Sequence, residues 1–184
     1  MAKLTVITGC MGSGKTTQLI RDTRDLYDSS MTYLVAKPMT DIRGAVNSVT
    51  SRGGWSEFCF LIPDKGFGDW AYSVKNNPVD IVFVDEAQFF ETDSFLVGMT
   101  ALMDSRDINE VRVYGLNTDF AGREFGALGT AMALADEVIH LKATCASCGG
   151  TATRTHRLSD SMEQIVVGGD DMYEALCWKC WDNG

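Results

Sequence analysis

Short apolar runs alternate with longer amphipathic segments along most of this chain. Six runs rich in β-branched and apolar residues have the length of strands: residues 4–8, 32–36, 58–62, 81–84, 111–116 and 137–141. Four segments between them are predicted helices: residues 15–26, 67–75, 94–104 and 130–135. This alternation predicts an α/β fold with a mostly parallel sheet and crossover helices.

Two segments depart from the simple alternation. Residues 81–84 are apolar without a break, as expected of a strand that is covered on both faces. Residues 39–55 are polar and contain glycine, so we expect a mobile loop after Pro38 ends the second strand. After Lys142 the composition changes to paired cysteines, glycines and polar residues. We therefore predict two parts, residues 1–141 and residues 142–184.

Composition and charge narrow the class of protein. A chain of 184 residues suits one domain with a small appendage. The formal net charge of -9 argues against a nonspecific nucleic-acid surface, which is normally basic. The N-terminus has no signal-peptide pattern, and no apolar stretch approaches the ~18 residues that span a bilayer. We therefore expect a cytoplasmic protein with neither a nucleic-acid nor a membrane partner.

The first strand leads into a phosphate-binding loop of the form G-x-x-x-x-G-K-[ST]. Glycines let the backbone turn so that successive N–H groups and the following helix N-terminus face phosphate oxygens. Lys15 can reach the β- and γ-phosphates of ATP, and the Thr16 hydroxyl can ligate Mg²⁺. The candidate phosphate-binding residues are Gly9, Met11, Gly12, Ser13, Gly14, Lys15 and Thr16.

An acidic pair follows the apolar strand at residues 81–84. Asp85 can complete the Mg²⁺ site from opposite the loop. Glu86 lies at the carboxyl edge of the sheet, where it can accept a proton from an attacking hydroxyl or orient a water. The alternative is that both acids are solvated turn residues. Phe89 and Phe90 belong either to the core or to the wall of a base pocket.

Four of the six cysteines form two C-x-x-C pairs: Cys145, Cys148, Cys177 and Cys180. Two such pairs can hold one Zn²⁺ tetrahedrally, and four thiolates leave no open position, so the metal is predicted to be structural. A redox dithiol and free buried cysteines are the alternatives. Cys10 and Cys59 stand alone and read as core or loop residues.

The 28 residues between the cysteine pairs form a tethered excursion that could lie across a ligand. Residues 164–169 are strand-like, and their backbone groups could read the edge of a base. Tyr173 could bond a sugar or stack on a base, or it could pack within a small zinc-binding lobe.

Taken together, these motifs resemble the thymidine kinases of animals, many bacteria, poxviruses and large phages. The matching segments run the length of the chain: residues 9–16, 85–90, 115–120, 125–126, 135–138, 154–157 and 166–169, with the four cysteines and Tyr173. Two positions depart from the family pattern. Cys10 replaces an expected proline, and Trp178 stands where the cysteine knuckle often has arginine.

The resemblance implies a P-loop, RecA-like fold with a zinc-binding lobe and a lasso loop over the nucleoside. It implies that ATP phosphorylates the thymidine 5′-hydroxyl, with Glu86 as general base and Thr16 and Asp85 serving Mg²⁺. It also implies a homotetramer that thymidine triphosphate inhibits at the acceptor site. The implied nucleoside-binding residues are Met11, Gln88, Leu116, Phe120, Phe125, Thr155, Arg157, Val166, Val167, Gly168, Gly169 and Tyr173.

Two other functions are compatible with parts of the sequence. A P-loop ATPase acting on nucleic acid could use the zinc lobe as a binding module and Glu86 to orient water. The acidic charge counts against it. A zinc-bearing nucleotide sensor without catalytic activity is the second alternative. The occurrence of a phosphate loop together with a carboxylate suited to catalysis counts against it.

Overall fold

The computed structural model describes residues 1–42, 47–51, 53–166, 168 and 171–182. Within them, the main sheet has six strands in the order β5-β2-β6-β7-β1-β8, and every pairing is parallel. The strands are β1 (Lys3–Thr8), β2 (Tyr33–Pro38), β5 (Phe60–Ile62), β6 (Ile81–Val84), β7 (Glu110–Gly115) and β8 (Glu137–His140). This sheet confirms the predicted α/β architecture.

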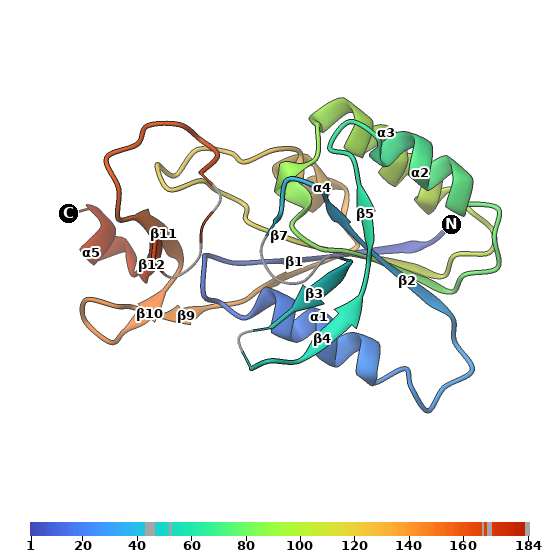
Figure 1. The fold of residues 1–184 in the computed structure, drawn as a ribbon, viewed down its shortest axis with the longest axis horizontal. Helices are drawn as coiled ribbons and strands as arrows, with labels where there is room; N and C mark the ends of the chain where they lie inside the picture. The colour runs from blue at the N-terminus through green and yellow to red at the C-terminus, as the bar shows by residue number, and fades with distance from the viewer. Residues whose placement is uncertain (43–46, 52, 167, 169–170, 183–184) are drawn as a thin grey trace.

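Helices cover both faces of the sheet (Figure 1). One face carries α1 (Lys15–Arg24), and the other carries α2 (Phe67–Val74), α3 (Thr92–Met103) and α4 (Leu128–Leu134). A 3₁₀ turn, η1 (Ala87–Phe89), follows β6. Within the described residues, no helix is long and apolar enough to cross a membrane.

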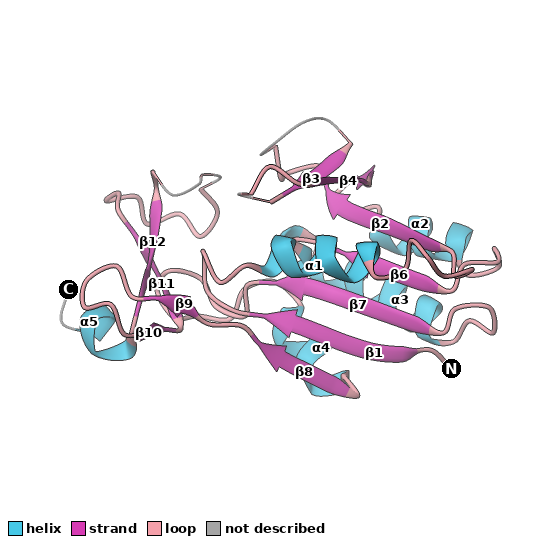
Figure 2. Ribbon diagram, turned by 90° about the horizontal axis from the view of Figure 1, so that it is seen from below, coloured by secondary structure: helices cyan, strands magenta, loops and turns pink. Residues whose placement is uncertain are grey.

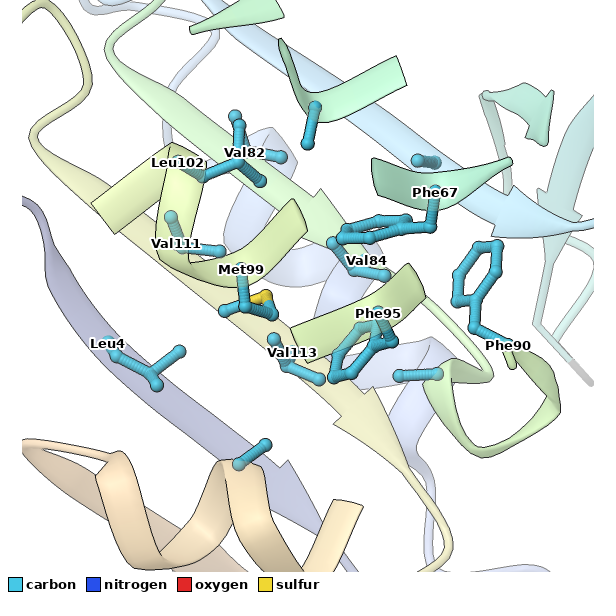
Figure 3. Close-up of a cluster of buried hydrophobic side chains, with 14 of the residues drawn as sticks. Leu4, Phe67, Val82, Val84, Phe90, Phe95, Met99, Leu102, Val111 and Val113 are labelled. Atoms are coloured by element: carbon cyan, nitrogen blue, oxygen red, sulfur yellow. The ribbon is translucent and has the colours of Figure 1, made fainter. Parts of the chain in front are cut away.

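The core consists of two layers because side chains alternate between the faces of each strand. Val82 and Val84 pack toward α2, α3 and α4, where Phe67, Phe95 and Met99 fill the larger layer (Figure 3). Ile81 and Phe83, the alternate residues of the same strand, face the other side of the sheet and pack with Leu19 and Ile20 of α1 in the second layer. A strand covered on both sides needs an unbroken apolar sequence, which is what residues 81–84 supply.

The described residues between 47 and 62 form three short strands where a loop and one strand were expected. A small antiparallel hairpin joins β3 (Ser48–Thr50) to β4 (Ser56–Phe58). The predicted strand at 58–62 divides at Cys59, whose N–H bonds to the Asn47 carbonyl at 3.0 Å and whose side chain is buried. This bond continues the β3–β4 register by one residue, and the chain then enters the main sheet as β5 at Phe60.

The C-terminal elements lie beyond the carboxyl ends of β1, β7 and β8 (Figure 2). They are the antiparallel pairs β9 (Ala143–Thr144) with β10 (Thr151–Ala152) and β11 (Arg154–Arg157) with β12 (Tyr173–Leu176), followed by α5 (Trp178–Asp182). The carboxyl edge is where open α/β sheets bind ligands, so this small lobe faces the expected site.

Candidate functional site

The phosphate loop joins β1 to α1 as predicted. Gly14 is the N-cap of α1 and has a φ of 87°, a left-handed conformation that glycine adopts without a steric penalty. The Lys15 ammonium is buried and donates to the carbonyls of Gly9 and Cys10, each at 3.1 Å. The loop therefore presents a lysine and a helix N-terminus, the two features that attract phosphate.

The acidic pair lies directly beside this loop. The Thr16 hydroxyl donates to the Asp85 carboxylate at 3.3 Å, so the start of α1 and the end of β6 meet at the two residues predicted to serve Mg²⁺. Both acids are buried, Asp85 at 2% exposure and Glu86 at 6%, which excludes the solvated-turn alternative.

Glu86 is held in a strained position. Its φ of 49° lies in the left-handed region, a conformation that costs a residue with a side chain about 1–2 kcal/mol. Its carboxylate accepts a 2.6 Å hydrogen bond from the side-chain Nε2 of Gln88, and the Oε1 of the same Gln88 side chain accepts from the Leu116 N–H at 3.0 Å. Such strain is maintained at functional sites when neighbouring contacts fix the residue.

A pocket with about 430 Å³ of empty space, part of it open to solvent, lies between Glu86 and the C-terminal lobe. Its lining is mainly apolar and aromatic, with a few polar groups, as is usual for sites that bind small molecules. Nine predicted nucleoside-binding residues line it: Met11, Leu116, Phe120, Phe125, Thr155, Arg157, Val166, Gly168 and Tyr173. The predicted base Glu86 lines it too.

Three predictions about this pocket have other outcomes. Gln88 is not among the described lining residues, because it lies behind the wall and bonds to Glu86 and Leu116. Val167 and Gly169 lie outside the described residues. Phe89 and Phe90, which the sequence left between core and pocket, differ in location: Phe89 lines the pocket, with its ring 5.6 Å from that of Phe125, and Phe90 belongs to the core.

Two lining residues were given no role by the sequence reasoning, Thr118 and Asp119, while Gln164 and Ile165 belong to the run 164–169 that was expected to read a base edge through its backbone. Asp119 begins a turn in which its carboxylate accepts from the N–H groups of Ala121 and Arg123, both at 2.9 Å. An aspartate followed three residues later by glycine is a turn signal that could have drawn attention to this position. The sequence carries no comparable signal for the side-chain bonds of Gln164.

Arg157 is a buried clamp inside the protein. Its guanidinium donates five hydrogen bonds: Nε and one terminal nitrogen to the Tyr173 hydroxyl at 3.2 and 2.8 Å, and the others to the carbonyls of Ser161 at 3.0 Å, Gln164 at 3.0 Å and Glu163. It also lies 3.8 Å from the centre of the Phe120 ring. A guanidinium has five N–H donors, so these contacts engage all of them.

One further contact joins the pocket to the phosphate loop, and the hydrogen bonds of Tyr173 and Trp181 hold the C-terminal lobe beside it. The Met11 N–H donates to the Thr155 hydroxyl at 3.0 Å. The Tyr173 hydroxyl donates to the Val166 carbonyl at 2.6 Å while it accepts from Arg157, so its ring is the part that faces the pocket freely. The Trp181 indole N–H lies between the carbonyls of Phe120 and Thr155, at 3.1 and 3.2 Å.

The four paired cysteines form one cluster in the C-terminal lobe. Their sulfur atoms all lie within 4.8 Å of one another, and those of Cys148 and Cys177 are 3.7 Å apart. Zinc–sulfur bonds of about 2.3 Å in a tetrahedron place sulfurs about 3.8 Å apart, so the cluster fits Zn²⁺. Backbone N–H groups, chiefly that of Cys177, lower the pKa of Cys145 to about 6, which favours the thiolate that a metal binds.

Of the two departures from the family pattern, Cys10 packs against the C-terminal lobe and Trp178 belongs to it. Cys10 is buried in a small apolar cluster with Cys145, Ala152 and Leu176, and burial raises the pKa of its thiol. It therefore attaches the phosphate loop to the zinc-binding lobe. Trp178 is exposed, 5.5 Å from Trp181 between ring centroids, and the Arg154 guanidinium lies 4.8 Å over its ring.

Comparison with known proteins gives a consistent result over the whole chain. A family model described as thymidine kinase matches residues 2–181. The chain is 37% identical to a thymidine kinase of Pyrobaculum aerophilum, over 95% of each protein. It is 35% identical to that of Enterobacteria phage T4, over 99% of this chain and 96% of the phage protein. It is 38% identical to that of Coprothermobacter proteolyticus, over 95% and 87% of the two chains.

Proposed function

The chain belongs to the thymidine kinase family, and from this premise we propose how its site transfers the γ-phosphate of ATP to the 5′-hydroxyl of thymidine. The observation that carries the proposal is the position of Glu86. This buried carboxylate lines the apolar pocket and follows Asp85, which contacts the first turn after the phosphate loop. A nucleoside in the pocket would therefore place its hydroxyl between a base and the donor phosphate.

The donor half of the site consists of the phosphate loop and Asp85. Lys15 and the loop N–H groups hold the phosphates of ATP, and their positive charge stabilises the charge that builds on the transferred group. Thr16 and Asp85, already in contact at 3.3 Å, would hold Mg²⁺, which supplies electrostatic stabilisation between the β- and γ-phosphates when it is bound.

Glu86 acts as the general base of the acceptor half. The 5′-oxygen of thymidine attacks the γ-phosphorus, its proton passes to Glu86, and the bond to the bridging oxygen breaks to release ADP. Gln88 donates to the Glu86 carboxylate at 2.6 Å and so fixes its direction. We therefore place Gln88 behind the base as a positioning residue, in place of the nucleoside contact that the resemblance implies.

The pocket selects the nucleoside through shape. Phe89, Phe120 and Phe125 supply flat apolar walls on which a base and sugar can pack. Met11, Leu116 and the Tyr173 ring are placed to surround the methyl group that distinguishes thymine from uracil. The backbone of Val166 and Gly168 would supply hydrogen bonds to the base edge. Arg157 and the Tyr173 hydroxyl shape this wall through the protein contacts described above.

The remaining expectations are proposals of the same account. Residues 142–184 would form a structural zinc lobe whose Zn²⁺ takes no part in the reaction, since four thiolates fill its coordination shell. Thymidine triphosphate would inhibit by occupying the acceptor pocket. The protein would act in the cytoplasm as a homotetramer, with ATP and thymidine as its substrates and without a nucleic-acid partner.

The decisive test is a nucleoside panel with labelled ATP and Mg²⁺. Thymidine is expected to accept the label at its 5′-oxygen, and ADP formation should depend on thymidine. A parallel reaction with single-stranded DNA tests the ATPase alternative. ATP hydrolysis stimulated by DNA and indifferent to thymidine, or failure of every pyrimidine deoxynucleoside to accept phosphate, would contradict the proposal.

A further inference from the structure

A buried carboxylate that lines the pocket bonds to a side chain from a distant segment that also lines it. Asp119 is 3% exposed, and one of its oxygens is taken up by the turn N–H groups of Ala121 and Arg123. Its other oxygen accepts from the Gln164 amide at 3.0 Å. The two residues are 45 positions apart in the sequence, so the bond connects separate parts of the fold.

Gln164 belongs to residues 161–166, which we call the covering segment because Gln164, Ile165 and Val166 line the pocket. Its Nε2 also donates to the Glu124 backbone carbonyl at 3.1 Å, so both amide hydrogens bond to residues 119–124. Its backbone carbonyl accepts from Arg157 at 3.0 Å. The covering segment is therefore held on the Arg157 side by its backbone and on the Asp119 side by one side chain.

We propose that Gln164 and Asp119 are positioning residues that hold the covering segment against the pocket and thereby set the affinity for the nucleoside. This inference rests on the proposed function, because it takes the pocket to be the thymidine site. Position 164 needs a side chain that donates two hydrogen bonds, since its partners are a carboxylate and a carbonyl, and both need a donor. Gln164 is an exposed residue, so these two hydrogen bonds, and not burial, fix its side chain.

Changing the amide to a carboxylate separates this role from general packing. In Gln164→Glu the side chain keeps its size but places a second negative charge about 3 Å from Asp119, a pairing that raises one carboxyl pKa strongly. The charged residues around position 164 are Asp119, which bonds to its side chain, Glu124, whose backbone carbonyl does so, Arg157, which bonds to the Gln164 carbonyl, and Glu163 beside it in the sequence. The variant should therefore bind nucleoside poorly when ionised and better when protonated.

The experiment measures thymidine affinity and turnover for Gln164→Glu and Gln164→Ala, with Glu163→Gln as the matched neighbour. At pH 8 both Gln164 variants should raise the thymidine Kd and KM about 10- to 100-fold, since a hydrogen bond to a charged group is lost. The ATP KM and the kcat at saturating thymidine should stay within about twofold, and Glu163→Gln should match the wild type. At pH 5.5 Gln164→Glu, and not Gln164→Ala, should recover thymidine affinity.

A second substitution tests the coupling between the two residues. Asp119→Asn keeps an oxygen for the turn N–H groups, and in the Gln164→Glu background it removes the like-charge pair. The double variant should bind thymidine more tightly than Gln164→Glu at pH 8 and lose the pH dependence, whereas independent structural defects would add. The proposal would be overturned if the Gln164 variants bound thymidine within twofold of the wild type, or if they lost ATP affinity and thymidine affinity equally. It would also be overturned if the losses of thymidine affinity in the double variant were additive.

Hydrogen exchange on the ligand-free protein keeps this test separate from the proposed function. Amides of residues 158–166 should exchange faster in both Gln164 variants than in the wild type and in Glu163→Gln. Unchanged exchange would overturn the positioning role even if thymidine is the substrate. A wild-type protein that phosphorylates no nucleoside would instead contradict the proposed function, while the exchange data still decide whether the contact holds the segment.

Discussion

Replacing Arg157 by lysine should weaken thymidine binding without weakening ATP binding. The arginine is 5% exposed, donates five hydrogen bonds and lies on the Phe120 ring. A lysine ammonium has three donors, so at least two bonds are lost along with the flat contact to the ring. At about 1 kcal/mol for each bond and about 1 kcal/mol for the ring, the loss is about 3 kcal/mol.

The loss of about 3 kcal/mol weakens thymidine binding because the bound nucleoside needs the covering segment in its ordered position. A loss of about 3 kcal/mol corresponds to about a 100-fold rise in Kd, which titration calorimetry with thymidine can measure directly. Arg154→Lys is the matched control, because Arg154 lies on the same strand and stacks on the exposed Trp178 ring. Arg157→Lys affinity within threefold of the wild type, or an equal loss for ATP, would refute this account of the clamp.

Three further changes test other parts of the structure. Gly126→Ala should lower the melting temperature and kcat, measured by calorimetry and ATP turnover. The φ of Gly126 is 58°, and a Cβ there would lie 2.4 Å from the Gln88 backbone carbonyl. Gly149→Ala, also at positive φ but with open space around it, should leave kcat unchanged. Cys148→Ser should reduce bound zinc from about one ion per chain and abolish thymidine binding, whereas Cys59→Ala should keep the metal; retained zinc would exclude the cluster. Asp80→Asn should reduce the fall in the free energy of unfolding at acid pH. Hydrogen bonds from the Thr32 N–H and hydroxyl lower the pKa of Asp80 below 3.8, so its contribution to stability is present above that pH and is lost as pH falls through the folded value. An unchanged dependence of the unfolding free energy on pH would contradict this.

Local sequence was sufficient where the chemistry is local. The phosphate loop follows β1 directly, and Asp85 and Glu86 follow an unbroken apolar strand, so their neighbourhood could be predicted from spacing alone. The cysteine pairs were equally informative, since two C-x-x-C turns carry the geometry of a zinc site within a few residues. Strand order at the carboxyl edge then brings Thr16 and Asp85 together without further information.

The parts that sequence could not predict depend on contacts between distant residues. The β3–β4 hairpin has the polar sequences SVT and SEF, and its pairing is supported by the burial of Val49 and Cys59 in the α1 layer. Phe89 and Phe90 are neighbours, yet the 3₁₀ turn sends one to the pocket and the other to the core. The sequence placed Arg157 near the nucleoside but could not show that its donors are used within the protein.

Asp119 and Gln164 show the same limit more sharply. Each is an ordinary polar residue in a loop, and only the packing of the C-terminal lobe against the sheet edge brings them to 3.0 Å. Pattern analysis finds residues whose chemistry is repeated at fixed spacing. It does not find a single hydrogen bond between two loops, because no periodicity specifies it.

The most direct test of the central claim is the rate of phosphoryl transfer to thymidine in Glu86→Gln, measured in a single turnover with ATP saturating. The substitution keeps the size of the side chain but removes the carboxylate that takes the 5′-hydroxyl proton. We predict that ATP binding is retained while the transfer rate falls about 10²–10⁴-fold. A transfer rate within a few-fold of the wild type would contradict the role of Glu86 as the base.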